Sequence, residues 1–348
     1  MTAGSPTPLR LGARTLHEEE HGPSASPTAL VDLSPDGTVT RELAADPVGW
    51  LGKAHWQRYG ADPALRVTLR SGPTVGLHAH PDRRVARAHF DSAWGATATW
   101  LVLGIDHAGA QVRLGFAEDL DAGRLADTIA SPREQGLLEA TNAVPVTPGD
   151  GLLVPAGVPH AAGPDVHVLT VHEPGETTVP LDGTWADGSG GGTAASARGN
   201  TADLDPIAAA ACVDRSAWSP ARLRSVHTTR RNARREGGGT RRALPPAADP
   251  FFTARWVTPD PLAWLPASFG LLVVLSGEGT LATQQGHEHP LSRGEAWLVP
   301  HTAGRVTVSG GLEGVHVAPP DSAAERPDAP AVERPLDLPG LDDPHGSG

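Results

Sequence analysis

The fold of this chain is indicated most directly by the stretch Leu77-His-Ala-His-Pro-Asp-Arg83, which places two histidines at alternate positions. Residues i and i+2 of a β-strand point to the same face, so His78 and His80 can both project into the interior of a β-barrel. A third histidine, His160, ends the stretch Val154-Pro-Ala-Gly-Val-Pro-His160. Three imidazoles from neighbouring strands make a donor set for a metal ion and leave a coordination position open. The pattern therefore predicts a metal-binding β-barrel.

Short apolar runs of strand length extend on both sides of these histidines. They comprise residues 67–70, 75–80, 99–104, 111–116, 151–155 and 166–171. Runs of this length, bounded by Gly, Pro or Asp, are typical of a β-sandwich or barrel. Residues 120–142 differ, because their apolar positions fit a helix, and Pro132 is expected to divide this insertion into two short helices.

The chain after residue 250 repeats this organisation. The stretch Pro148-Gly-Asp-Gly-Leu-Leu-Val-Pro-Ala156 matches Arg293-Gly-Glu-Ala-Trp-Leu-Val-Pro-His301 in its glycine, its acid and its Leu-Val-Pro. Two related β-barrels in one chain account for the repeat. Arg305 stands near the position where His160 would recur, so the second barrel is predicted to hold no metal.

Composition divides the chain into five parts. Residues 1–30 lack apolar periodicity and are predicted to be disordered or loosely attached. The metal-binding barrel is placed at 31–186, and a Gly/Ser linker at 187–202. Residues 203–320 are predicted to hold a connecting helix, a basic loop at 230–242 and the second barrel, followed by a disordered tail at 321–348. The basic loop is expected to be solvated and mobile. The alternative is that it binds a phosphorylated ligand.

Charge and cysteine content limit the classes of partner. The 348 residues carry a formal net charge of −12 at pH 7, which opposes binding to nucleic acid and to anionic membranes. Cys212 is the only cysteine, so no internal disulfide can form, as is usual in a reducing compartment. The chain shows no signal-peptide pattern and no apolar stretch of membrane-spanning length. A cytoplasmic location is therefore expected.

The segments around the histidines resemble a known family. The stretches His78-Ala-His-Pro-Asp-Arg83, Gly95-Ala-Thr-Ala-Thr-Trp100, Val146-Thr-Pro-Gly-Asp150 and Val154-Pro-Ala-Gly-Val-Pro-His160 are together similar to the type I mannose-6-phosphate isomerases of short bacterial form, in the cupin superfamily. The resemblance extends over about residues 45 to 320. It implies a mainly β fold of two cupin-type (jelly-roll) barrels, the first of which carries a small helical insertion.

The resemblance also implies a chemistry. One zinc ion is expected on His78, His80 and His160, although similar ligands accept iron or manganese. The implied reaction interconverts mannose 6-phosphate and fructose 6-phosphate in carbohydrate metabolism, with a small-molecule sugar phosphate as the partner. No catalytic residue is predicted. The other histidines are expected to be surface or satisfied core residues, among them His167, His172 and His316.

Two residues depart from the family pattern. The family's Gly-Lys-Thr-Glu segment aligns with Gly95-Ala-Thr-Ala98, so Ala98 replaces a glutamate that binds zinc and Ala96 a lysine that contacts the substrate. Three arginines are candidates to replace that lysine: Arg83, Arg84 and Arg87.

Three hypotheses follow from these departures. The chain is an isomerase with a three-histidine metal site, or a catalytically degenerate cupin that binds a sugar or a regulatory ligand. The third hypothesis is a metal-dependent enzyme with another substrate, such as a three-histidine iron oxygenase, because that ligand set leaves positions for dioxygen. The sequence does not indicate the oligomeric state.

Overall fold

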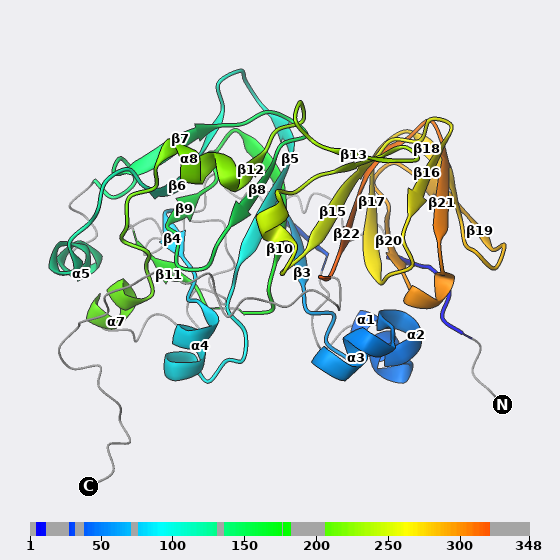
Figure 1. Ribbon diagram of the computed structural model, residues 1–348, viewed down its shortest axis with the longest axis horizontal. Helices are drawn as coiled ribbons and strands as arrows, with labels where there is room; N and C mark the ends of the chain where they lie inside the picture. Colours follow the sequence, from blue (N-terminus) through cyan, green and yellow to red (C-terminus); the bar gives the residue numbers. More distant parts are fainter. Residues whose placement is uncertain are drawn as a thin grey trace, which may run out of the picture.

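The computed structural model describes residues 5–11, 28–31, 38–70, 76–130, 136–175, 177–181 and 206–320. This part of the protein is mainly β, as predicted, and its strands form four antiparallel sheets. Two barrels lie side by side, each built from two of these sheets (Figure 1). No helix in the described ranges is long and apolar enough to cross a membrane. The predicted linker at 187–202 and the predicted tail at 321–348 lie outside the described residues.

The first barrel consists of a six-stranded sheet and a five-stranded sheet. Their strand orders are β12-β8-β5-β10-β3-β2 and β11-β4-β9-β6-β7. The strands are β2 (Thr28–Val31), β3 (Arg66–Arg70), β4 (His78–Ala79), β5 (Ala98–Ile105), β6 (Gln111–Phe116), β7 (Thr141–Pro145), β8 (Gly151–Val154), β9 (His160–Ala161), β10 (Val166–His172), β11 (Val179–Pro180) and β12 (His227–Thr228).

The second barrel pairs a seven-stranded sheet with a four-stranded sheet. Their strand orders are β1-β20-β17-β22-β15-β14-β13 and β16-β21-β18-β19. The strands are β1 (Leu9–Leu11), β13 (Arg235–Gly237), β14 (Thr240–Arg242), β15 (Thr253–Val257), β16 (Leu262–Leu265), β17 (Gly270–Ser276), β18 (Glu278–Ala282), β19 (Glu288–Ser292), β20 (Ala296–Val299), β21 (Val306–Gly310) and β22 (Glu313–Ala318).

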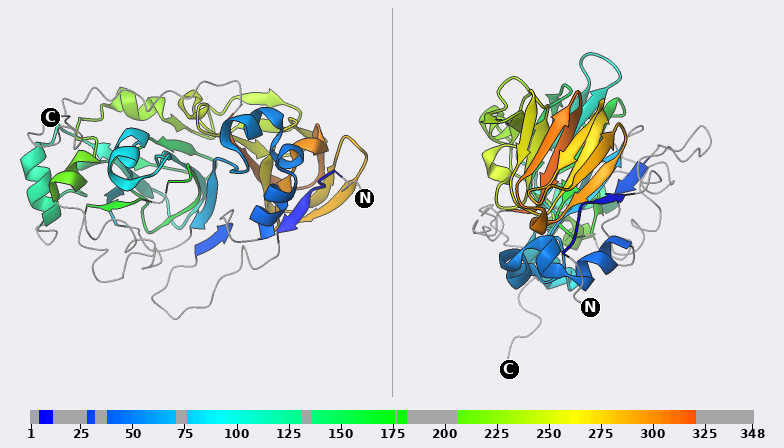
Figure 2. Two further views of the ribbon diagram at one scale, coloured as in Figure 1. Left: turned by 90° about the horizontal axis from the view of Figure 1, so that it is seen from below. Right: turned by 90° about the vertical axis from the view of Figure 1, so that its right-hand side faces the viewer.

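A continuous hydrophobic core joins the two barrels. The large sheets of the barrels lie next to each other (Figures 1 and 2). One cluster of buried side chains contains Leu101 and Leu169 of the first barrel together with Val273 and Val317 of the second. Each fully buried aliphatic side chain of this kind contributes about 1.5–3 kcal/mol to stability. The barrels are therefore packed onto each other rather than merely tethered.

Helices cover the ends and sides of the barrels. They are α1 (Thr38–Ala45), α2 (Pro47–Leu51), α3 (Lys53–Tyr59), α4 (Arg83–Phe90), α5 (Ala122–Ala130), α7 (Pro206–Ala211) and α8 (Pro220–Ser225), with the short 3₁₀ helices η3 (Pro246–Ala248) and η4 (His301–Ala303). Helix α5 lies in the predicted insertion at 120–142, whereas Pro132 lies outside the described residues. Helix α4 begins where Asp82 accepts a hydrogen bond from the backbone N–H of Val85 (2.8 Å), directly after the histidine pair.

The repeated sequence stretch builds the same turn in both barrels. The Asp150 carboxylate accepts a hydrogen bond from the backbone N–H of Thr147 (3.0 Å), and the Glu295 carboxylate accepts one from Ser292 (3.1 Å). The glycine before each acid has a positive φ, 92° and 85° respectively, which explains why glycine recurs there. Each turn leads into a buried strand of a large sheet, β8 or β20. The internal repeat is therefore present in the structure as well as in the sequence.

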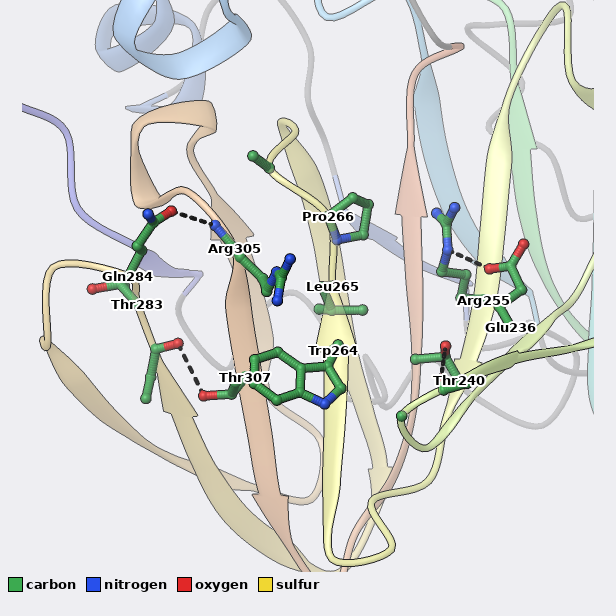
Figure 3. A pocket seen from close by; sticks show the side chains of 14 residues that line it. Glu236, Thr240, Arg255, Trp264, Leu265, Pro266, Thr283, Gln284, Arg305 and Thr307 are labelled. Carbon is green, nitrogen blue, oxygen red and sulfur yellow. Dashed lines mark hydrogen bonds and ion pairs between the residues drawn. The ribbon is translucent and has the colours of Figure 1, made fainter.

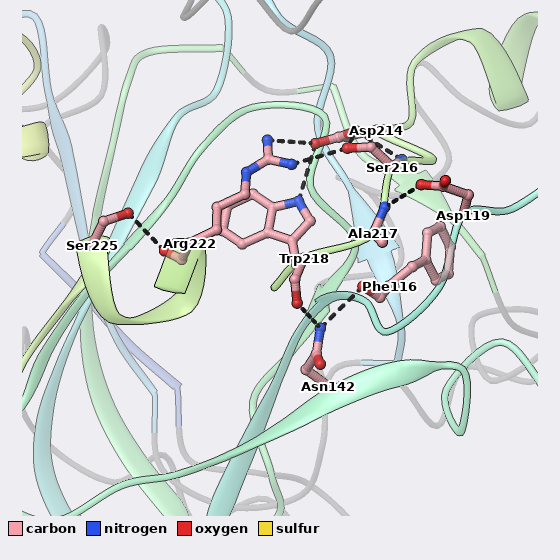
Figure 4. A network of polar contacts seen from close by, with 9 residues as sticks. All are labelled: Phe116, Asp119, Asn142, Asp214, Ser216, Ala217, Trp218, Arg222 and Ser225. Atoms are coloured by element: carbon pink, nitrogen blue, oxygen red, sulfur yellow. Dashed lines mark hydrogen bonds and ion pairs between the residues drawn. The ribbon is translucent and has the colours of Figure 1, made fainter. Parts of the chain in front are cut away.

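The segment predicted to connect the barrels belongs instead to the first barrel. β12 pairs with β8, and the Trp218 backbone N–H donates to the Phe116 carbonyl (2.8 Å). The buried Asp214 carboxylate accepts hydrogen bonds from the Trp218 indole (3.1 Å) and from Arg222 (3.0 Å), as Figure 4 shows. The Asn142 amide donates to backbone carbonyls on both sides of this contact. The predicted boundary near residue 203 is therefore wrong, because these buried polar contacts attach residues 206–228 to the first barrel.

Two further predictions are corrected. The basic loop at 230–242 is largely the hairpin β13–β14, which continues the seven-stranded sheet through pairing of β14 with β15. Residues 9–11, predicted to be loosely attached, form β1, which pairs with β20 at the other edge of that sheet. In both places backbone hydrogen bonds to a buried sheet supply an order that the local composition does not reveal.

Candidate metal centre

The structure brings the three predicted histidines together inside the first barrel. His78 in β4 and His160 in β9 are direct register partners, and His80 follows on the same extended segment. The ring centroids of His78 and His160 lie 4.2 Å apart. The centroid of His80 lies 5.0 Å from that of His78 and 5.1 Å from that of His160. Each ring offers one nitrogen, and the three nitrogens lie within 4.8 Å of one another. No second group of three His, Cys, Asp or Glu side chains meets this distance in the described part of the chain.

Backbone carbonyls fix which nitrogen each ring presents. Nδ1 of His78 lies 2.7 Å from the Gly76 carbonyl oxygen, Nδ1 of His80 lies 2.9 Å from that of Thr177, and Nδ1 of His160 lies 2.7 Å from that of Val158. A carbonyl oxygen only accepts, so each Nδ1 carries the proton and each Nε2 keeps its lone pair. This arrangement is typical of histidines that ligate metal. The protein therefore presents three oriented Nε2 donors, which fit zinc and similar divalent ions.

The surroundings of the three rings are apolar. Trp100 on β5 contacts the ring of His160, with centroids 5.4 Å apart. Leu114 on β6 is the register partner of His160 and is 1% exposed. His160 itself is 2% exposed, whereas His80 is half-buried. Of the three histidines, His80 is therefore the most exposed, and apolar side chains line the side of His160.

The two alanines of the family comparison lie at the edge of this site. Ala96 and Ala98 are each 3% exposed. Between them, the Thr97 backbone N–H donates to the Glu173 carboxylate (3.0 Å). This carboxylate is 1% exposed and is also bound by the Arg83 guanidinium (2.8 Å). The acid that contacts the segment between these alanines is therefore engaged in holding β5 against the end of β10.

The structure gives the three arginines predicted to replace the missing lysine different surroundings. Arg83 is held by Glu173, and its guanidinium lies 5.1 Å from the centre of the Trp94 ring. Arg84 and Arg87 lie on exposed positions of α4. Of the three, Arg83 therefore lies nearest to the Ala96–Ala98 segment, because its partner Glu173 also binds Thr97.

One residue near the site was not predicted. His172 ends β10 and is the register partner of Ala98, although it is isolated in the sequence. Only the pairing of β10 with β5 places it there, and a single sequence does not reveal strand register. The hydrogen bonds of Glu173 likewise depend on residues far apart in the chain.

A separate pocket lies on the second barrel and has a volume of about 1200 Å³. Figure 3 shows Trp264 and Arg305 on one side and the Arg255–Glu236 ion pair (2.7 Å) on the other. The Arg305 guanidinium lies 5.3 Å from the centre of the Trp264 ring. The lining contains no histidine or cysteine, so this pocket offers no donor set like that of the first barrel.

The sequence matches no family model and no curated protein. Solved structures do match. The mannose 6-phosphate isomerase from Bacillus subtilis has a TM-score of 0.55 and 18% identity, over 73% of this chain and 74% of that one. A variant of the phosphomannose isomerase from Salmonella typhimurium has a TM-score of 0.65 and 13% identity, over 90% and 99% of the two chains.

A third match is a mannose 6-phosphate isomerase bound with zinc and yttrium. Its TM-score is 0.60 at 14% identity, over 81% of this chain and 85% of that one. Identities this low show the fold alone. The chain thus has the two-barrel cupin fold of the mannose-6-phosphate isomerases.

Proposed function

We propose that the protein is a zinc-dependent isomerase that interconverts mannose 6-phosphate and fructose 6-phosphate in the cytoplasm. The observation that carries the proposal is the convergence of His78, His80 and His160, which each offer one ring nitrogen within 4.8 Å of the others. The fold shared with mannose-6-phosphate isomerases supports it as an analogy. Three protein ligands leave a coordination position for a substrate, as catalytic zinc sites do.

The chemistry of such a reaction matches what these residues supply. An aldose–ketose isomerase moves a proton between adjacent carbons while negative charge develops on oxygen. A divalent metal, when bound, supplies Lewis acidity for that charge. The backbone carbonyls at each Nδ1 hold the ligands in one orientation. Trp100 and Leu114 line the His160 side of the site with apolar side chains, and a low local dielectric strengthens electrostatic interactions.

The deciding experiment compares wild-type protein with the His160→Ala variant. We expect the variant to lose isomerase activity and to bind zinc at least about 100-fold more weakly, because His160 is a buried ligand. A loss of about 100-fold is the upper range for residues that only support metal ligands. Chelator competition measures the affinity, and a coupled assay measures fructose 6-phosphate. The control His107→Ala alters an exposed histidine paired with Asp165 and should change neither quantity.

Two outcomes would contradict the proposal. A metal-replete wild type that neither converts nor binds mannose 6-phosphate would remove the sugar phosphate as substrate. Elemental analysis that finds iron and no zinc, after expression with both metals available, would favour the three-histidine oxygenase instead.

The second candidate is a degenerate cupin that binds a sugar without catalysis, and Ala96 and Ala98 favour it. The double variant Ala96→Lys with Ala98→Glu separates the two candidates. If three nitrogen donors already form a working site, we expect less than about a tenfold gain in kcat, well below the 10² to 10⁴ that one positioned acid–base group contributes. A gain of about 10² or more would show that the natural chain lacks its catalytic groups.

A further inference from the structure

A fourth histidine lies beside the three that converge. His172 and Ala98 are register partners across the antiparallel pair β10 and β5. Side chains of such partners point to the same face of a sheet, and so do residues i and i+2 of one strand. Trp100 therefore shares the face of His172, and Trp100 contacts the ring of His160. His172 thus lies on the face of the sheet that looks into the first barrel, next to the position where a carboxylate is missing.

The ring of His172 has the same tautomer as the three donors. Its Nδ1 lies 2.7 Å from the Glu173 carbonyl oxygen, so Nδ1 carries the proton and Nε2 the lone pair. The residue is not among the three whose nitrogens lie within 4.8 Å of one another, so it stands beside the donor set rather than within it. It is half-buried, whereas its neighbour Val171 is fully buried in the core between the barrels. The position suits a group that acts on a bound substrate.

The other groups at this edge of the site are less suited to proton transfer. Ala96 and Ala98 carry no titratable group. The Glu173 carboxylate is 1% exposed and is held by Arg83 and by the Thr97 backbone N–H. Both oxygens of this carboxylate are therefore engaged in contacts that join α4, β5 and the end of β10.

We propose that His172 is the acid–base residue of this site, an inference that rests on the proposed isomerase function. Nε2 takes the proton from C2 of the aldose as the C2–H bond breaks, and the electron pair forms a C1–C2 double bond while charge moves to O1. The same proton then passes from the imidazolium to C1. The proton of the O2 hydroxyl moves to O1, and O2 becomes the ketone oxygen. The imidazole begins and ends neutral, and the step consumes no other reactant.

The first test compares the variants His172→Ala and His167→Ala. His167 lies on the same strand, but its Nε2 is bonded to Asp106 at the other end of β10 (2.8 Å), so it is a matched control. For His172→Ala we expect kcat to fall by about 10² to 10⁴ with KM changed less than about threefold, and added imidazole to restore part of kcat. Zinc affinity should stay within about threefold of wild type, and the control should leave all of these values unchanged.

Each contrary outcome has a definite meaning. An unchanged kcat overturns the inference, and so does a fall in kcat that follows an equal loss of zinc, because His172 would then act as a ligand. A readout independent of turnover is the rate at which diethyl pyrocarbonate modifies His172, followed by mass spectrometry. We expect mannose 6-phosphate to slow modification of His172 and not that of His167.

This protection experiment separates the inference from the proposed function. A wild type without isomerase activity in which His172 is protected contradicts the proposed reaction but supports the placement of His172 against the bound sugar phosphate. Absence of protection in a wild type that does convert mannose 6-phosphate overturns the role of His172 alone.

Discussion

His316 is a single histidine whose surroundings differ sharply from those of the donor set. It lies on β22 in the second barrel, is 1% exposed, and its Nδ1 has no hydrogen-bond partner in the described residues. Burial, together with the positive charge of its register partner Arg255, lowers the pKa of His316 to about 3. The expectation that His316 is a core residue holds, but its polar nitrogen is unsatisfied.

This burial predicts a pH dependence of stability. The folded-state pKa of about 3 lies below the ordinary value of 6.5, so the unfolded chain takes up the proton first and stability falls as pH drops from 6.5 towards 3. At 1.36 kcal/mol per pKa unit, the loss between pH 7 and pH 5 is about 2 kcal/mol. Urea unfolding at both pH values measures the free energy of unfolding. We expect its fall between pH 7 and pH 5 to be smaller in His316→Leu than in wild type by about 2 kcal/mol. Equal pH slopes in the two proteins would contradict it.

Single residues also show what the sequence reveals about the site. The convergence of His78 and His80 is readable, because the alternation of side chains along one strand is a local property. His160 could be added because a Pro-Ala-Gly turn precedes it in the stretch Val154-Pro-Ala-Gly-Val-Pro-His160. His172 could not, since its place depends on which residue of β5 it faces, and that pairing joins residues far apart in the chain.

At the scale of elements, the two repeated turns make a matched pair with different surroundings. The Asp150 carboxylate is buried and accepts hydrogen bonds from Thr147, from the Arg230 backbone and from His227. Burial raises the pKa of Asp150, but the hydrogen bonds, led by that of His227, outweigh it and leave the pKa lowered. The Glu295 carboxylate is more exposed and binds Arg10 and Trp297 as well as the turn.

The two turns should therefore differ in their cost of substitution. We expect Asp150→Ala to lower the free energy of unfolding by about 3 kcal/mol, because buried donors lose their charged acceptor. Glu295→Ala should cost about 1 kcal/mol, since water can replace part of its contacts. Chemical denaturation of both variants beside wild type measures the difference. Equal losses would mean that the turn itself, rather than the buried contacts, determines the effect.

The elements also show where local sequence patterns are insufficient. In the first barrel, apolar runs located the strands β3, β4, β5, β6, β8 and β10, because buried strands need β-branched and aliphatic residues. The hairpin β13–β14 was missed, since its exposed strand Arg235–Gly237 is polar and gains its order from pairing. Gly237, Gly238 and Gly239, interpreted as a sign of mobility, all have positive φ: Gly237 ends β13, and Gly238 and Gly239 form the turn. Helices α1–α3 were missed because each is short.

At the scale of the whole molecule, the sequence predicted two barrels but not the extent of contact between them. A linker rich in glycine and serine suggests separate domains, yet one hydrophobic cluster extends through both large sheets. The sequence does not show this, because residues that face the other barrel and residues that face the barrel interior are equally apolar. Strands buried on both faces lack the alternation that would distinguish them.

The shared core predicts that the barrels unfold together. Val317 and Val308 are both 0% exposed and both lie in the second barrel, but Val317 belongs to the core shared with the first barrel and Val308 to the interior of the second. Substitution of either by alanine removes buried methyl groups and should cost about 1–3 kcal/mol. If the molecule is one cooperative unit, both variants shift the midpoint of a single unfolding transition.

Zinc release during urea unfolding reports on the first barrel alone, since the three histidines lie there. We expect its midpoint to coincide with that of tryptophan fluorescence in wild type and to move by the same amount in Val317→Ala and Val308→Ala. Separate barrels would give another result: Val308→Ala would shift the fluorescence change and leave zinc release where it was. Val317→Ala alters the contact between the barrels. If zinc release shifted in that variant alone, the shared core would stabilise the metal site, but the two barrels would not unfold as one cooperative unit.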